Sequence, residues 1–294
     1  MSITSPHYCH QASLEGAMNS LALTPPLSLE QRQDLTRVFT TVIDACEPLQ
    51  NPKPYKPITL VRLTYECARS EASRDNFLRF FFQQTKISSD GSPSGSIPTS
   101  EYVPRLMAFA QTLFDNFFLP LKAAARKTPQ PSPAALSDDE SKQLALAILN
   151  MFDDGVVHLI ESIDIDRPRN AITLTHDFHH LFGRFEVYFE PTGNEPHTYR
   201  VDSTRTGILR HRVFPVDRTL FLTDTRTIDP PSPRLLAIHS AIAHVLHRSA
   251  AGRYIDSILE DLDQGEISVD GSTPLGHFTA LRIHGWWDGR IRAY

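Results

Sequence analysis

The chain has 294 residues, of which 40% are hydrophobic, a fraction that suffices for a buried core in one large domain or two small ones. Its formal net charge of −5 excludes a protein built as a whole to coat nucleic acid, because such proteins are basic. Three widely spaced cysteines, Cys9, Cys46 and Cys67, argue against a disulfide framework or a zinc ribbon. We expect reduced thiols in an intracellular protein, nuclear or cytoplasmic, with no contact to a membrane.

The N-terminal part of the chain has the pattern of helices separated by proline-broken loops. Residues 1–26 are expected to be a disordered tail, and residues 27–86 a helical region. Ser28 and Gln31 fit a capping box at the start of the first helix. The expected helices run from residue 28 to before residue 48, over 58–71 and over 74–84. The Ser/Gly/Pro-rich stretch 87–100 is typical of a linker.

The remaining residues, 101–294, are expected to form one α+β domain with short antiparallel strands and C-terminal helices. A long helix is predicted over 102–126, and a second one, capped by Ser137 and Glu140, up to Phe152. Alternating or β-rich runs predict strands over 185–189, 197–201 and 219–223, and helical periodicity predicts helices over 233–248 and 254–262. The fold class is therefore α+β, with a mostly helical N-terminal region.

The segment Val156–Phe189 is the part of the chain that joins chemically useful residues to regular local structure. It holds His158, Asn170 and His179 in that order, twelve and then nine residues apart. Its pattern predicts a strand over 156–160, a second strand over 171–174, and a helix over 176–182 that is capped by Thr175 and ended by Gly183. This order of elements is that of a ββα-metal fold.

Phosphodiester hydrolysis needs residues of these types. A histidine at a strand end can take a proton from water, and it does so best with a pKa near ambient pH. A helix histidine can hold a divalent cation against the scissile phosphate, and a loop asparagine can bind the cation or fix the loop. We therefore assign His158 as the general base and His179 as a metal ligand, with Mg²⁺, Mn²⁺ or Zn²⁺ as the cation. Asn170 either binds the cation as well or fixes the catalytic loop. His176 and His180 flank this set, and one of them is expected to support the ligand.

Four segments carry a resemblance to a known family: IDIDRPRNAITLTHDFHHLFGRFEVYFEP, HTYRVDST, FPVDRTLFLTD and PPSPRLLAIHSAIAHVLHRSAAGRYID. They resemble the HNH endonuclease superfamily, and more closely a group of fungal proteins with an HNH nuclease domain. The resemblance covers most of Leu113–Tyr294 and is most specific from Asn170 to His179. It implies a divalent-metal-dependent endonuclease. The family's first-histidine strand has no counterpart after Pro133, so the first half of the motif is expected to be missing.

Other interpretations stay open at this point. The chain is either an active nuclease or a catalytically degenerate HNH scaffold that acts as a binding or structural protein. A truncated gene model is the third alternative, because the join near residues 132–138 is abrupt. Nucleic acid is the expected partner, through five arginines that lie within a short stretch: Arg200, Arg205, Arg210, Arg212 and Arg218. A solvated surface is the alternative role for these arginines.

Overall fold

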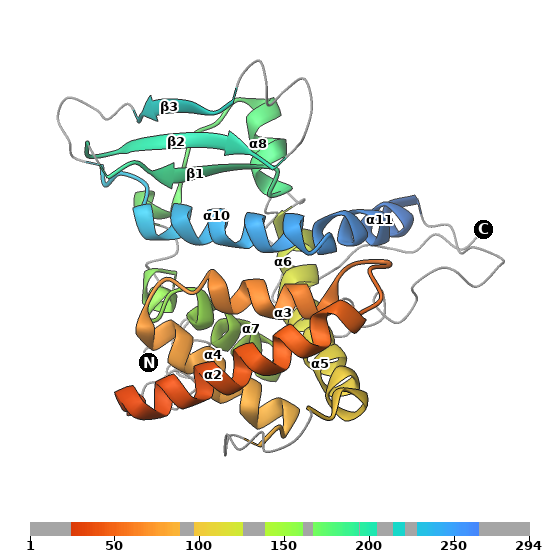
Figure 1. The fold of residues 1–294 in the computed structure, drawn as a ribbon. Coiled ribbons are helices and arrows are strands. Elements are labelled where there is room, and N and C mark those ends of the chain that lie inside the picture. Colours follow the sequence, from red (N-terminus) through yellow and green to blue (C-terminus); the bar gives the residue numbers. More distant parts are fainter. Residues whose placement is uncertain are drawn as a thin grey trace, which may run out of the picture.

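The structure, a computed structural model, describes residues 25–88, 97–125, 139–160, 167–193, 195–204, 214–220 and 228–264. It has the predicted α+β architecture, in three layers that Figure 1 shows from one side. A three-stranded sheet and helix α8 form one layer, α10 and α11 form the middle layer, and the N-terminal helices form the third. Most of the expected tail 1–26 and of the expected linker 87–100 lies outside the described residues.

The helices of the N-terminal layer agree with the sequence pattern, except that the helix predicted over 58–71 ends at Glu66. They are α2 (Leu29–Cys46), α3 (Pro57–Glu66), α4 (Glu71–Thr85), α5 (Thr99–Leu113), α6 (Leu119–Ala125) and α7 (Asp139–Phe152), with a short 3₁₀ turn η1 at Glu47–Leu49. The predicted capping box is confirmed. Ser28 Oγ accepts from the Gln31 amide at 3.2 Å, and Gln31 Oε1 accepts from the Ser28 amide at 3.0 Å.

The long helix predicted over 102–126 is continuous but contains one turn of π-helix, η2 (Phe114–Phe118). The turn lies directly before Pro120, whose ring cannot donate a hydrogen bond and crowds the preceding turn. A wider turn relieves that crowding without ending the helix. It also directs Phe114 and Phe118 into the core, where both are fully buried.

The sheet consists of β1 (Val187–Pro191), β2 (Thr198–Ser203) and β3 (Val216–Thr219), antiparallel in the order β1-β2-β3. Successive residues of a strand face opposite sides, and β1 uses both. Val187 and Phe189 belong to a small hydrophobic cluster that includes residues of α8 (His176–Gly183). Tyr188 and Glu190 face the helix α10 instead, because the Tyr188 ring and the Glu190 carboxylate contact residues of that helix.

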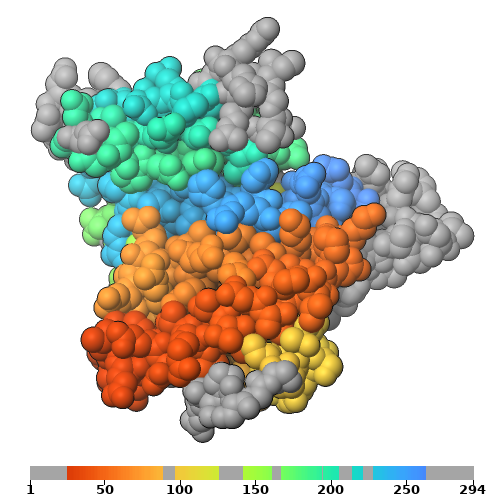
Figure 2. Space-filling view, viewed as in Figure 1, coloured from red at the N-terminus to blue at the C-terminus, as the bar shows by residue number. Residues whose placement is uncertain are grey.

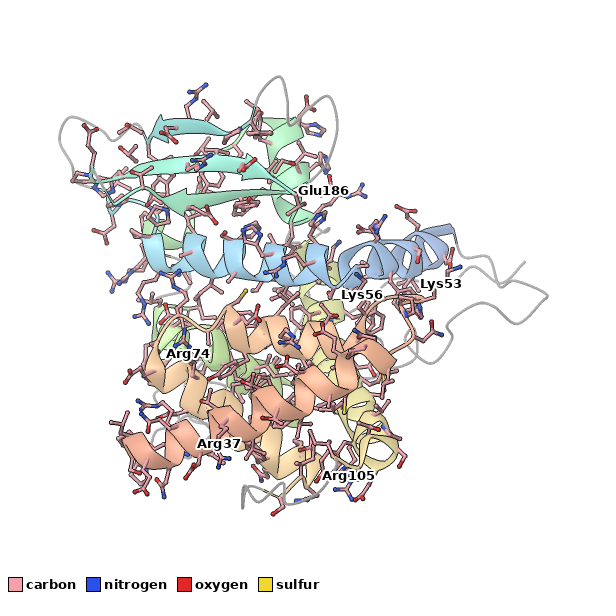
Figure 3. The ribbon with its side chains drawn as sticks, in the orientation of Figure 1. Arg37, Lys53, Lys56, Arg74, Arg105 and Glu186 are labelled. Carbon is pink, nitrogen blue, oxygen red and sulfur yellow. The ribbon has the colours of Figure 1, made fainter. Side chains whose placement is uncertain are left out.

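Helix α10 (Pro233–Arg248) has the predicted bounds, and α11 (Ala251–Gln264) follows it. Leu236 of α10 belongs to the small cluster, whereas Ile238 and Ile242 belong to the large one, which also takes in α2 to α7. Figure 2 shows α10 and α11 as a band between the sheet and the N-terminal helices. The Lys56 amide donates to the Ser249 carbonyl at 2.8 Å, which ties the start of α3 to this band (Figure 3).

The large cluster draws residues from both predicted regions, 27–86 and 101–294. The boundary between these regions stays a prediction. No helix in the described ranges is both long enough and apolar enough to cross a membrane.

The predicted strand with His158 is wrong, because Val156–Leu159 forms a 3₁₀ helix, η3. Gly155 has a φ of 73°, a left-handed conformation that turns the chain between α7 and η3. The Val156 amide then donates to the Asp153 carbonyl at 3.1 Å. Val156 and Val157 are adjacent and both buried, whereas a half-buried strand buries alternate residues. The apolar run therefore packs as a turn against α7.

The predicted strand Ala171–Leu174 is also wrong, although its alternation is real. Ile172 and Leu174 pack against the small cluster, and Ala171 and Thr173 are exposed. The segment is assigned to neither helix nor strand, and it pairs with none of the three described strands. Burial of one side alone is sufficient to produce the period of two, so this pattern does not require a hydrogen-bonded neighbour.

Candidate functional site

Helix α8 carries the histidines of the predicted site, and its bounds confirm the prediction within one residue. Thr175 has the extended conformation of an N-cap and its carbonyl accepts from the His179 amide at 2.8 Å, but its side chain makes no capping hydrogen bond. Gly183 is the last helical residue rather than a left-handed stop. A Cβ at Gly183 would lie 2.8 Å from the Ala125 carbonyl oxygen, so glycine is needed there for the close approach of α8 to the end of α6.

One side of α8 is apolar and fixed, and the other presents imidazoles to solvent. Phe178 and Leu181 pack into the small cluster. His176, His179 and His180 are all exposed. The Nε2 atoms of His176 and His180 are 3.1 Å apart, and their ring centroids are 4.4 Å apart. The exposed side of α8 therefore carries three imidazoles that can bind a metal ion, while its opposite side packs against the small cluster.

Asn170 occupies a short 3₁₀ turn, η5 (Pro168–Asn170), between the other two residues of the motif. Its Nδ2 donates to the Leu159 carbonyl at 2.8 Å. This bond closes the loop that follows His158, because it joins residues eleven positions apart. The neighbouring Arg169 carbonyl accepts from the Ser232 amide at 2.7 Å, which fixes the same loop to the start of α10. This contact is of the kind expected if Asn170 fixes the loop.

His158 is exposed on η3, one residue before the carbonyl that Asn170 holds. The structure thus brings Asn170 to the His158 segment. The ring centroid of His179 lies 6.0 Å from that of His180, its neighbour on α8. The assignments of His158, Asn170 and His179 stay predictions.

The turn that carries His158 is anchored by an ion pair. Asp153 is almost fully buried at the end of α7. Arg234 of α10 donates to it twice, from Nη2 at 2.6 Å and from Nε at 3.1 Å. Arg69 approaches the same carboxylate at 3.7 Å. The position of η3 is therefore set by α10 and by the loop between α3 and α4, both far away in sequence.

Sequence analysis missed the residue that holds α8 to α10, which is His239. Its ring lies between those of Phe182 and Phe185, with centroids 3.7 and 4.5 Å away and planes nearly parallel. Nε2 is 2.9 Å from the Phe182 carbonyl and donates to it. Burial lowers the pKa of His239 to about 4, although the bond to the carbonyl acts in the opposite direction. No local signal identifies this histidine, because its partners lie more than fifty residues away.

We expect the free energy of unfolding to fall as the pH drops from about 6.5 to about 4, through His239. The unfolded chain takes up a proton at the ordinary histidine pKa of about 6.5, whereas the folded protein does so only near 4. The contribution of His239 to the free energy of unfolding is fully present above about pH 6.5. It decreases as the pH falls, and about 2–3 kcal/mol is lost by about pH 4. Urea unfolding at several pH values measures it.

The His239→Gln variant is the control, because glutamine keeps a donor for the Phe182 carbonyl but does not titrate. Subtracting its unfolding free energy from that of the wild type removes the contribution of the carboxylates. A difference that stays constant between pH 4 and pH 7 would contradict the assignment.

A cavity of about 460 Å³ opens beside the C-terminal end of α8. Its charged lining residues are Lys122, Arg184, Glu186, Arg253, Asp256 and Glu260. The Arg184 Nε is 3.2 Å from Glu186 Oε1, and Lys122 Nζ is 2.9 Å from Asp256 Oδ2. Figure 3 shows Glu186 at the start of β1, next to α8. Since acids lie against the bases, this cavity lacks the net positive charge that a phosphate site needs.

The arginine-rich segment lies partly outside the described residues, which exclude Arg205, Arg210 and Arg212. Arg200 on β2 and Arg218 on β3 are exposed. Arg218 pairs in register with Tyr199, so it faces the same side of the sheet as that residue, and Arg200 faces the other. The role of the segment in phosphate binding stays a prediction.

Comparison with known proteins gives one match. No curated protein and no solved structure matches the chain significantly. Residues 132–190, about one fifth of the chain, match a family model described as HNH endonuclease. The matched range contains His158, Asn170 and His179, and it ends within β1. This segment is therefore similar to HNH endonucleases, which supports a nuclease-like function.

Proposed function

We propose that this protein is an HNH-type phosphodiesterase that cleaves nucleic acid with the help of a divalent cation. The observation that carries the proposal is the family match over residues 132–190, which includes the whole of α8. The geometry of α8 supports it, because a helix whose apolar side is packed and whose imidazoles are exposed can meet a phosphate without rearranging.

Each residue of the motif has a role in this proposal. His158, exposed on η3, takes the proton from the attacking water. Asn170 keeps the loop after His158 closed through its bond to the Leu159 carbonyl. His179 offers a ring nitrogen to the cation from the middle of α8.

The described residues fit a cation with few protein ligands. No group of three or more His, Cys, Asp or Glu side chains able to hold a metal gathers in the described part of the chain. Magnesium in phosphate chemistry keeps several waters and takes other oxygens from the substrate, so one or two protein ligands are sufficient. When bound, the ion would stabilise negative charge on the phosphate and on the leaving oxygen.

The test is nicking of supercoiled plasmid with Mg²⁺, Mn²⁺ or Zn²⁺. We expect the wild-type protein to nick the plasmid, and both His179→Ala and His158→Ala to be slower by at least about a hundredfold, since general-base catalysis alone contributes that much. Initial rates of conversion to open circles measure the effect. His247→Ala is the matched control, because His247 is also an exposed helix histidine but lies on α10. Equal rates for the wild type and His179→Ala would remove the metal-ligand assignment.

A second candidate is a degenerate HNH scaffold that binds nucleic acid without cleaving it. One observation favours it: His158 lies on a 3₁₀ turn instead of a strand end. This candidate predicts plasmid retention in a gel-shift experiment at every cation concentration, with no nicking by any variant.

A further inference from the structure

Helix α8 carries a second arrangement of nitrogen donors that the proposed nuclease chemistry does not use. His176 and His180 are four residues apart, so their side chains lie one above the other on the same side of the helix. Their Nε2 atoms, the outer atoms of the two rings, are 3.1 Å apart. The rings are tilted by 75°, and they meet at these two atoms rather than face to face. His179 takes no part in this contact.

We propose that His176 and His180 form a chelate for a transition-metal ion that prefers nitrogen ligands, such as Zn²⁺, Ni²⁺ or Cu²⁺. Zinc binds histidine nitrogen at about 2.0–2.1 Å, so two nitrogens on one ion stand about 2.8–3.4 Å apart for coordination angles between about 90° and tetrahedral. The observed separation of 3.1 Å lies in that range. The pair is thus preorganised, and binding requires little movement of either ring.

The surroundings of the pair agree with this role. The Asp177 carboxylate is 3.6 Å from Nδ1 of His176, the nitrogen on the opposite side of the ring. Its negative charge favours a proton on Nδ1 and therefore leaves the Nε2 lone pair available to a metal. The side chain of His176 is 83% exposed, so an ion reaches the pair from solvent and completes its coordination shell with water.

The number of imidazoles distinguishes this chelate from the proposed nuclease site, where His179 offers a single ring nitrogen. Imidazole suits zinc, copper and nickel, whereas magnesium prefers oxygen ligands. Ni²⁺ is therefore expected to bind the pair even in excess Mg²⁺, which takes most of its ligands from water and substrate. The chelate depends only on the described geometry of α8 and does not rest on nuclease activity.

The experiment is a calorimetric titration of the chelator-treated full-length chain with Ni²⁺, in the presence of millimolar Mg²⁺. Wild type, His179→Ala and His247→Ala are expected to bind one ion with the same affinity. His176→Ala and His180→Ala are each expected to bind at least about tenfold more weakly, because loss of a direct ligand costs no less than loss of a supporting residue. Both side chains are exposed, and circular dichroism checks that the variants remain folded.

The outcomes separate the two proposals. Unchanged Ni²⁺ affinity in His176→Ala and His180→Ala, or no binding by the wild type, would overturn the chelate and reduce the pair to a hydrogen bond between two neutral rings. Loss of binding in His179→Ala alone would also overturn it. Binding that depends on the pair in a protein with no nicking activity supports the chelate while the proposed nuclease function fails.

Discussion

Replacing Asp256 by alanine is expected to lower the free energy of unfolding by about 3–5 kcal/mol, because the change leaves a buried ammonium group without its carboxylate. The side chain of Lys122, on α6, is only 2% exposed. Its Nζ donates to Asp256 Oδ2 at 2.9 Å and to the Gly252 carbonyl at 3.0 Å. Without Asp256, a neutral acceptor such as the Gly252 carbonyl does not balance a full charge at low local dielectric. The midpoint of urea unfolding measures the loss.

Two further variants make this prediction specific to the ion pair. The double variant Lys122→Met with Asp256→Leu removes both charges, and it is expected to recover most of the lost stability, since apolar replacements of buried pairs are often neutral. Glu101→Ala removes the exposed partner of Arg105 and is expected to cost less than about 0.5 kcal/mol. A double variant no more stable than Asp256→Ala would show that packing, rather than the unpaired charge, carries the effect.

Asp75→Ala is expected to cost about 3 kcal/mol, for a different reason. Asp75, on α4, is 2% exposed and accepts from Arg32 at both oxygens, from Nε at 2.6 Å and from Nη2 at 2.9 Å. The Leu27 amide donates to the same carboxylate at 3.1 Å. Hydrogen bonds to Asp75 raise the pKa of Arg32 above its ordinary value. The carboxylate therefore holds the start of α2 against α4, and alanine removes three bonds at once.

The loss is expected to be smaller than for Asp256, because Arg32 keeps a second partner, Glu71, at 2.7 Å. The matched control is Asp34→Ala, whose exposed pair with Arg37 spans 3.3 Å and contributes less than about 0.5 kcal/mol. Unfolding curves followed by circular dichroism compare the two variants. Equal losses for Asp75→Ala and Asp34→Ala would contradict the importance of burial.

The elements that sequence analysis predicted well are those whose signals are local. Ser28 and Gln31 mark the start of α2 because a capping box needs only residues three apart. Pro233 marks the start of α10, since proline is tolerated in the first turn of a helix. The strand assignments at residues 156–160 and 171–174 were wrong because an apolar run or an alternation records burial and not a hydrogen-bonded partner.

The site was predictable only in part, for the same physical reason. Spacing predicts that His176–Phe182 is a helix and that its histidines lie on one side. It does not predict that His239 inserts between Phe182 and Phe185, or that Gly183 must admit the Ala125 carbonyl, because these contacts join distant parts of the chain. The direction of the Asn170 side chain is likewise set by a loop whose shape no local pattern encodes.

The family match ends at residue 190, inside β1 (Val187–Pro191). Strand β1 forms hydrogen bonds with β2, and one face of β1 lies on α10. Both β2 and α10 lie beyond the matched residues. The matched segment therefore packs in part against elements that lie outside it. If it were moved into another protein without β2 and α10, the segment would keep the residues of the motif but lose these contacts.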